Sequence, residues 1–269
     1  RMIEDIRLGA KEMDLAAQTR FTNATLLGEF DGGGHTLDFA GVPAQAYFFY
    51  EIGAGAVMKD VRVENLTLGR TAGTGSDIYV GLIRRASDNA SLRGIHMENV
   101  SLQNAYQDAG CLAAYVQNVQ IKDCTVAGAE ITSSASAYEL YVGGLVGGSA
   151  SGSNVSIYNS FVRDLDMRLT QGSSVAGAGG IIGYMYLGSE VRYPVVKSCY
   201  AQGEIHTNFS NCGGIAGKCN GSISGCWTDV DIYGSKNMGG IAGYVLASGT
   251  QNYNYHSNLV VSGELYTSS

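Results

Sequence analysis

The chain has 269 residues and a formal net charge of −7, with 38 glycines against only 2 prolines. Its acidic balance argues against a nucleic-acid partner, which requires a basic surface to neutralise phosphates, and against binding to an anionic membrane surface. Abundant glycine with little proline suits a chain that turns often and keeps its backbone N–H groups for hydrogen-bonded strands. The composition therefore favours β-structure.

Residues 1–45 are predicted to form an N-terminal cap, and residues 46–269 a repetitive region. The repetition consists of two alternating motifs. The first is a glycine pair followed by an apolar residue, as in GGLVG (143–147), GGIIG (179–183), and GGIAG (213–217 and 239–243). The second is a short apolar strand, as in VRVENLTL (61–68), IHMENVSL (95–102), VQIKDCTV (119–126), VSIYNSFV (155–162), VVKSCYA (195–201), SISGCWT (222–228) and NYHSNLV (254–260). Seven units result.

Alignment of the second motif predicts one column of side chains that point into the interior. Successive members are separated by as few as 24 residues (124 − 100) and as many as 39 (199 − 160), so variable loops must connect the units. The predicted column contains Leu66, Val100, Cys124, Ser160, Cys199, Cys226 and Asn258.

Apolar residues alternate with period two inside each motif, as at Val61 and Val63 or Val119 and Ile121, which indicates strands. Short strands, glycine corners and irregular unit lengths predict an all-β fold: a right-handed parallel β-helix (β-solenoid) of about seven irregular coils with an N-terminal cap. The glycine pairs are predicted to lie where two backbones approach closely, and the Leu or Ile after each pair to fill the core.

Residues 170–189 carry no charge but contain too many polar and small residues for a membrane span, so they are predicted to form a core coil. Neither an HExxH zinc motif nor a GxSxG nucleophile motif occurs in the sequence. We therefore assign no catalytic, cofactor-binding or metal-binding residues and no cofactor.

The most suggestive polar cluster is a column of acidic residues, each directly before an apolar residue. Stacked carboxylates could hold calcium, serve a polysaccharide lyase or hydrolase, or form a solvated edge that prevents aggregation. The predicted column contains Glu130, Asp166, Glu204, Asp231 and Glu264.

Three further features have a structural and a functional interpretation. Cys199 and Cys226 fall on successive coils, either as a disulfide or, as we expect, as reduced buried thiols. An amide ladder inside one turn is predicted from Asn65, Asn99, Asp123 and Asn159. Tyrosines near strand ends either line the corners or furnish a face for a sugar or a protein: Tyr47, Tyr50, Tyr115, Tyr184, Tyr186, Tyr244, Tyr253 and Tyr255.

The ordered motifs resemble the GLUG repeats of bacterial surface proteins, and FDGGGHTL (30–37) resembles the opening of such arrays. The resemblance implies a β-helical module that is extracellular or attached to the cell wall. It occurs in adhesins and in the N-terminal regions of Gram-positive IgA-cleaving zinc metallopeptidases. The first three units depart from the glycine pair, with Phe48-Phe49, Val80-Gly81 and Gly110-Cys111 in its place.

From these features we expect a non-catalytic structural or binding module, a monomeric fragment without membrane insertion, that is an accessory region of an IgA-peptidase-like metallopeptidase. Its partners would be host immunoglobulin, a glycan or another domain of the same chain. The alternatives are an adhesin module and a β-helical polysaccharide lyase or hydrolase.

Overall fold

The structure is a computed structural model that describes residues 1–9, 24–41, 43–44, 46–69, 79–133, 140–170, 176–186, 194–246, 249–256 and 261–265. Of residues 43–44 and 261–265, only the backbone is described. The described residues form 29 strands and no helix.

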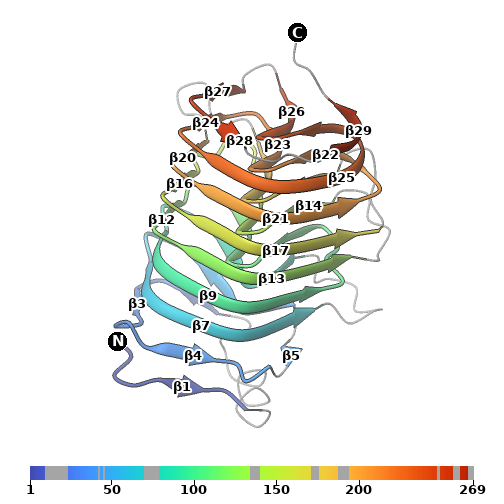
Figure 1. The fold of residues 1–269 in the computed structure, drawn as a ribbon. Helices are drawn as coiled ribbons and strands as arrows, with labels where there is room; N and C mark the ends of the chain where they lie inside the picture. Colours follow the sequence, from blue (N-terminus) through green and yellow to red (C-terminus); the bar gives the residue numbers. More distant parts are fainter. Residues whose placement is uncertain are drawn as a thin grey trace.

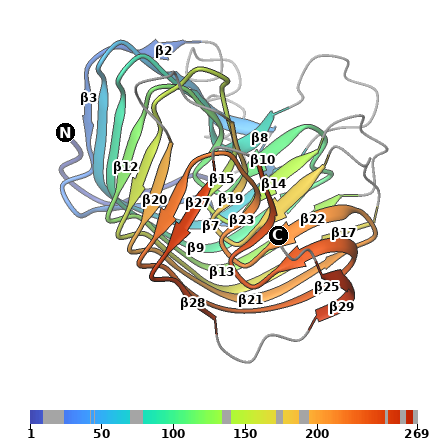
Figure 2. The same ribbon diagram turned by 90° about the horizontal axis from the view of Figure 1, so that it is seen from above.

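The fold is a right-handed parallel β-solenoid, which confirms the predicted fold class. Strands pair in parallel with those of the preceding and following coils, and Figure 1 shows them running from left to right across the front, one coil above another. Seven coils follow one another from β7 to β28 and β29, and Figure 2 looks along their axis.

One curved sheet contains the longest strands. Its members are β1 (Ile6–Arg7), β4 (Thr36–Asp38), β5 (Pro43–Ala44), β7 (Val57–Gly69), β9 (Ser91–Gln103), β13 (Thr125–Ser133), β17 (Phe161–Leu169), β21 (Tyr200–Thr207), β25 (Trp227–Gly239), β28 (Tyr255–His256) and β29 (Val261–Leu265). We call it the long sheet.

Shorter strands complete each coil. The turn before the long sheet contributes β3 (Glu29–Asp31), β12 (Gln120–Lys122), β16 (Ser156–Tyr158), β20 (Val195–Lys197), β24 (Ser222–Ser224) and β27 (Thr250–Asn252). The strands that end at the glycine pairs are β10 (Asp108–Gly110), β14 (Tyr141–Gly143), β18 (Gly177–Gly179) and β22 (Ser210–Gly213). The remaining ladder contains β2 (Thr25–Leu26), β6 (Tyr47–Ile52), β8 (Tyr79–Ala86), β11 (Ala113–Val116), β15 (Val146–Ser149), β19 (Ile182–Met185), β23 (Ala216–Cys219) and β26 (Ala242–Val245).

The predicted N-terminal cap continues the same stack. β3, β4 and β5 each pair in parallel with β7, and β1 pairs with β4 at the end of the stack. Strand pairing therefore crosses the expected boundary between residues 45 and 46 without a break.

The glycine pairs lie at close backbone approaches, as predicted. A Cβ atom added at Gly180 would lie 2.2 Å from the Gly214 carbonyl oxygen, and one at Gly144 would lie 2.3 Å from that of Gly180. The residue after each pair is buried in the core, as at Ile181 and Ile215. Each glycine therefore lets one coil pack directly on the backbone of the next.

Each early coil turns at two residues of left-handed conformation, five positions apart, such as Asp60 (φ 51°) and Asn65 (φ 55°). The prediction of one amide ladder is therefore wrong: there are two. Asn99 Nδ2 donates to Asn65 Oδ1 (3.2 Å) at the second corner, and Asn159 Nδ2 donates to Asp123 Oδ1 (2.5 Å) at the first. Asn and Asp suit both places because their short side chains tolerate this backbone conformation.

The predicted inward column also mixes these two corners. Thr125 pairs with His96, which places Cys124 level with Ile95 rather than with Val100. At the other end Trp227 pairs with Tyr255, so Cys226 lies level with Asn254 and not with Asn258.

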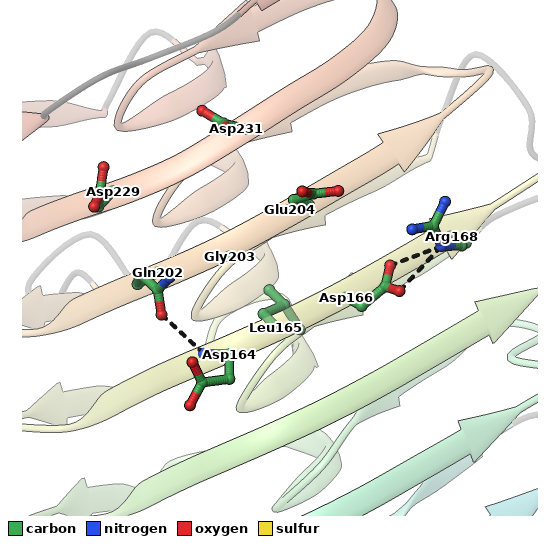
Figure 3. A pocket seen from close by; sticks show the side chains of 9 residues that line it. All are labelled: Asp164, Leu165, Asp166, Arg168, Gln202, Gly203, Glu204, Asp229 and Asp231. Carbon is green, nitrogen blue, oxygen red and sulfur yellow. Dashed lines mark hydrogen bonds and ion pairs between the residues drawn. The ribbon is translucent and has the colours of Figure 1, made fainter.

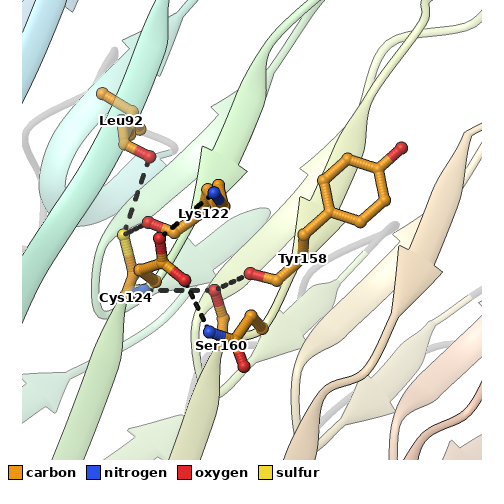
Figure 4. A network of polar contacts seen from close by, with 7 residues as sticks. Leu92, Lys122, Cys124, Tyr158 and Ser160 are labelled. Atoms are coloured by element: carbon orange, nitrogen blue, oxygen red, sulfur yellow. Dashed lines mark hydrogen bonds and ion pairs between the residues drawn. The ribbon is translucent and has the colours of Figure 1, made fainter.

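The corrected column forms a ladder of contacts between coils. The backbone N–H of Cys124 donates to Ser160 Oγ (3.2 Å; Figure 4), that of Cys199 to Cys226 Sγ (3.5 Å), and that of Cys226 to Asn254 Oδ1 (3.0 Å). All six cysteines are buried free thiols, Cys199 and Cys226 included. Burial raises the pKa of the Cys111, Cys124 and Cys212 thiols to about 12.

Candidate binding face

A column of aromatic side chains runs along the outer face of the long sheet. Each ring belongs to the residue directly after the inward column, and because strand side chains alternate between faces, it points outward. Register pairs the four rings from coil to coil. We call Phe161, Tyr200, Trp227 and Tyr255 the aromatic column.

The rings of the aromatic column are accessible from solvent. Phe161 is 38 % exposed, Trp227 50 % and Tyr255 63 %. The Tyr200 and Trp227 ring centroids are 5.2 Å apart, and those of Trp227 and Tyr255 are 6.2 Å apart. Burial and the negative charges of Asp229 and Asp164 raise the pKa of the Tyr200 phenol, which keeps it protonated near neutral pH.

Four of the five predicted acidic residues form a column on the same face, four or five residues along the strands from the aromatic column. Register pairs Glu130 with Asp166, Asp166 with Glu204, and Glu204 with Asp231. The fifth assignment, Glu264, is wrong. The pairing of β25 with β29 shifts register after Tyr233, and Glu264 lies opposite Lys236.

The acidic column borders an open hollow of about 610 Å³. Gly203 is one of its lining residues, and a Cβ there would lie 2.2 Å from the Leu165 carbonyl oxygen, so the two coils approach closely at this point. Figure 3 shows the surrounding polar groups. The described lining residues are Asp164, Leu165, Asp166, Arg168, Gln202, Gly203, Glu204, Asp229 and Asp231.

Several of these polar groups are held by neighbours on the same face. Asp166 pairs with Arg168 Nε at 2.9 Å, and Glu204 contacts His206 Nε2 at 2.8 Å. Gln202 Oε1 accepts a hydrogen bond from the Asp164 backbone N–H (3.0 Å). The side chains are therefore oriented before any ligand arrives, which lowers the entropic cost of binding.

A second hollow of about 480 Å³ adjoins the first and shares Arg168 with it. His206 and Tyr233 stack in it with ring centroids 4.3 Å apart and planes 12° apart. The outer face thus presents aromatic rings on both sides of the acidic column.

Within the part of the chain that the structure describes, no three His, Cys, Asp or Glu side chains come together in a group that could hold a metal ion. Calcium binding by the acidic column therefore has no support from this geometry. Hydrogen-bond acceptance is what its carboxylates can supply.

Most of the tyrosines named from the sequence lie elsewhere. Tyr50 and Tyr79 pack against the Arg84 guanidinium at 4.7 and 5.0 Å, and Tyr184 packs against Lys218 Nζ at 4.5 Å. Tyr184 is only 5 % exposed. The contacts of Tyr50 with Arg84 and of Tyr184 with Lys218 link strands of successive coils. Of the predicted set, only Tyr255 belongs to the aromatic column.

The aromatic column is the feature that sequence reasoning missed. Its signal was present, because the residue after Ser160, Cys199 and Cys226 is aromatic in each unit. The misplaced Asn258 concealed the fourth member, Tyr255.

Comparison of the chain with models of protein families, with curated proteins and with solved structures finds no match. In the described residues there is also no helix of the length and apolar character needed to cross a membrane.

Proposed function

We propose that this chain is a non-catalytic binding module that presents the outer face of β17, β21 and β25 to a glycan. The aromatic column is the observation that carries the proposal. Monomeric proteins rarely leave several large rings exposed in one row without a use for them. The flat apolar face of a pyranose ring packs on such rings, and its hydroxyl groups donate hydrogen bonds to carboxylates beside them.

The scaffold suits such a role. Each coil rests on the next through backbone hydrogen bonds and glycine contacts, so the outer side chains are presented about 4.8 Å apart from coil to coil. Sites on rigid strands hold their geometry better than sites on loops. A repeating polymer can engage several coils at once.

The proposed location and parent protein of the module rest on the repeat motifs. Their resemblance to GLUG repeats supports an extracellular or cell-wall-attached module of a bacterial protein, either an accessory region of an IgA-cleaving metallopeptidase or an adhesin. Immunoglobulin is the alternative partner in both settings.

Binding of the chain to a glycan array and to immobilised IgA tests the proposal. We expect retention by a subset of glycans, and loss of that retention in Trp227→Ala. The variant Leu27→Ala is the control, because Leu27 is 66 % exposed at the other end of the stack. Glycan binding that survives Trp227→Ala, or no glycan binding at all, would contradict the proposal. Depolymerisation of a bound glycan would assign a lyase or hydrolase instead.

A further inference from the structure

We propose that the glycan bound by this face carries free amino groups, with a sugar ring on the aromatic column and an ammonium group in the acidic hollow. This inference rests on the proposed function and names the class of its ligand. It starts from the aromatic column, and the charge beside that column selects the ligand.

The charge of the hollow is strongly one-sided. Among its described lining residues, Arg168 is the one cation and it already pairs with Asp166 at 2.9 Å. Five residues of the lining carry carboxylates: Asp164, Asp166, Glu204, Asp229 and Asp231. An ammonium group gains attraction there, whereas an anionic sugar such as a uronic acid would be repelled.

Acceptors outnumber donors in the hollow as well. Its five carboxylates accept hydrogen bonds and donate none, whereas Arg168 and Gln202 are the side-chain donors among its described lining residues. A ligand rich in donors therefore suits it, and hydroxyl and ammonium groups are donors. An extended basic peptide suits the face less well, because its carbonyl groups need donors while the strands beneath are paired on both sides.

Distances along β25 match a short run of sugar rings. Trp227, Asp229 and Asp231 all point outward from this strand, and alternate residues of a strand lie roughly 7 Å apart. A ring stacked on Trp227 thus places substituents near Asp229, and the adjoining ring reaches Asp231. Tyr233 and His206 stack in the adjoining second hollow.

The ligands for the test differ only in charge. Calorimetry of the chain with a β-linked glucosamine pentamer and with its fully N-acetylated equivalent separates the ammonium contribution from ring stacking. We expect the amino pentamer to bind at least about ten-fold more tightly, with an advantage that shrinks as salt is raised. Equal affinities would overturn the inference and leave the proposed function standing. If neither pentamer binds and the array retains no protein, both the inference and the proposed function are contradicted.

Variants locate the ammonium group. Asp229→Asn with Asp231→Asn keeps the shape of the hollow and removes two charges, so it should abolish the preference for the amino pentamer while the N-acetylated pentamer binds unchanged. Trp227→Ala should weaken both pentamers, by about thirty-fold if Trp227 is an anchor of the usual strength. Glu98→Gln is the matched charge control, because Glu98 is exposed on the same face of β9 outside the hollow.

Two outcomes would contradict the assignment directly. One is a preference for amino sugar that persists in the double Asn variant. The other is tighter binding of pentalysine than of the glucosamine pentamer, which would assign the face to a basic peptide.

Discussion

The outer face of the long sheet changes character halfway along the solenoid. In the cap and the first three coils the column that becomes aromatic contains Thr36, Arg62, His96 and Thr125, and in the last four coils it contains Phe161, Tyr200, Trp227 and Tyr255. The neighbouring column changes from Thr67 and Ser101 to Glu130, Asp166, Glu204 and Asp231.

The backbone beneath this change stays the same. Glycine allows close contact of coils in both halves, and parallel pairing continues throughout. The comparison indicates that the interior determines the coil geometry while the outer columns vary independently. A binding face can therefore be confined to a few coils without altering the fold.

The largest expected effect tests whether both halves share one interior. Gly110→Ala in the first half and Gly180→Ala in the second should each cost at least about 3 kcal/mol of unfolding free energy, because the added methyl meets backbone that cannot move aside. The nearest backbone atoms would be 2.5 Å from it at Gly110 and 2.2 Å at Gly180.

Denaturant unfolding measures both costs. Gly28→Ala is the control, because no atom lies within 4 Å of the added methyl, and it should change stability little. If only one of the two core variants is destabilised, the two halves do not share an interior.

A smaller effect is expected at the corners. Asn159→Ala removes the hydrogen bond to Asp123 and places alanine at φ 47°, a left-handed conformation, which should together cost about 1–2 kcal/mol. Asn159→Gly relieves the backbone strain and should recover part of the loss. Thermal unfolding of both variants checks this, and equal stability of the two would mean that the backbone conformation contributes nothing.

These corners also explain how far the sequence could predict the fold. Period-two alternation and glycine pairs were sufficient for strands, parallel coils and the buried Leu and Ile positions. They were not sufficient for the register of the strands. Asp60 and Asn65, which are five positions apart, are both corner residues, and each is directly followed by an apolar residue. Nothing in the local sequence distinguishes one corner from the other, so in the early units the two columns look like one.

Uncertain register also explains why the sequence predicts only part of the candidate face. Asp166, Glu204 and Asp231 occupy equivalent positions in successive units, so the sequence predicts their column. Glu264 lies beyond a register shift in β25 that depends on packing between coils. The hollow at Gly203 depends on the close approach of Leu165 from the neighbouring coil, which only the assembled stack contains.

A third prediction moves the boundary between the two halves. Thr125→Tyr would extend the aromatic column by one coil, since Thr125 pairs with Phe161. One additional stacked ring should tighten binding of the glucosamine pentamer about three-fold, or roughly 0.5–1 kcal/mol. Thr132→Tyr, on the same strand but outside the column, is the control in the calorimetric titration. An equal gain from both variants would show that added aromatic surface, rather than the column, improves binding.

The smallest effect concerns stability at acidic pH near the N-terminal end of the stack, where Asp38 lies on β4. The hydrogen bond from Asn65 Nδ2 (2.9 Å), followed by that from the Ala40 N–H (2.8 Å), lowers the pKa of Asp38 below its usual 3.8. A lowered pKa in the folded state means that the unfolded chain binds the proton first. The stabilisation is therefore complete above the usual value and is lost as pH falls through the lowered one.

Unfolding free energy measured between about pH 5 and pH 2 should thus fall less steeply in Asp38→Asn than in the parent chain. Asn65→Gly keeps the left-handed corner (φ 55°) and removes the donor, so it should flatten the same range to a lesser degree. Trp227→Ala, at the aromatic end, should leave the slope unchanged. If Asp38→Asn leaves the slope of unfolding free energy against pH unchanged, the contacts of this carboxylate add no acid-sensitive stability. Backbone pairing alone would then stabilise the N-terminal end of the stack.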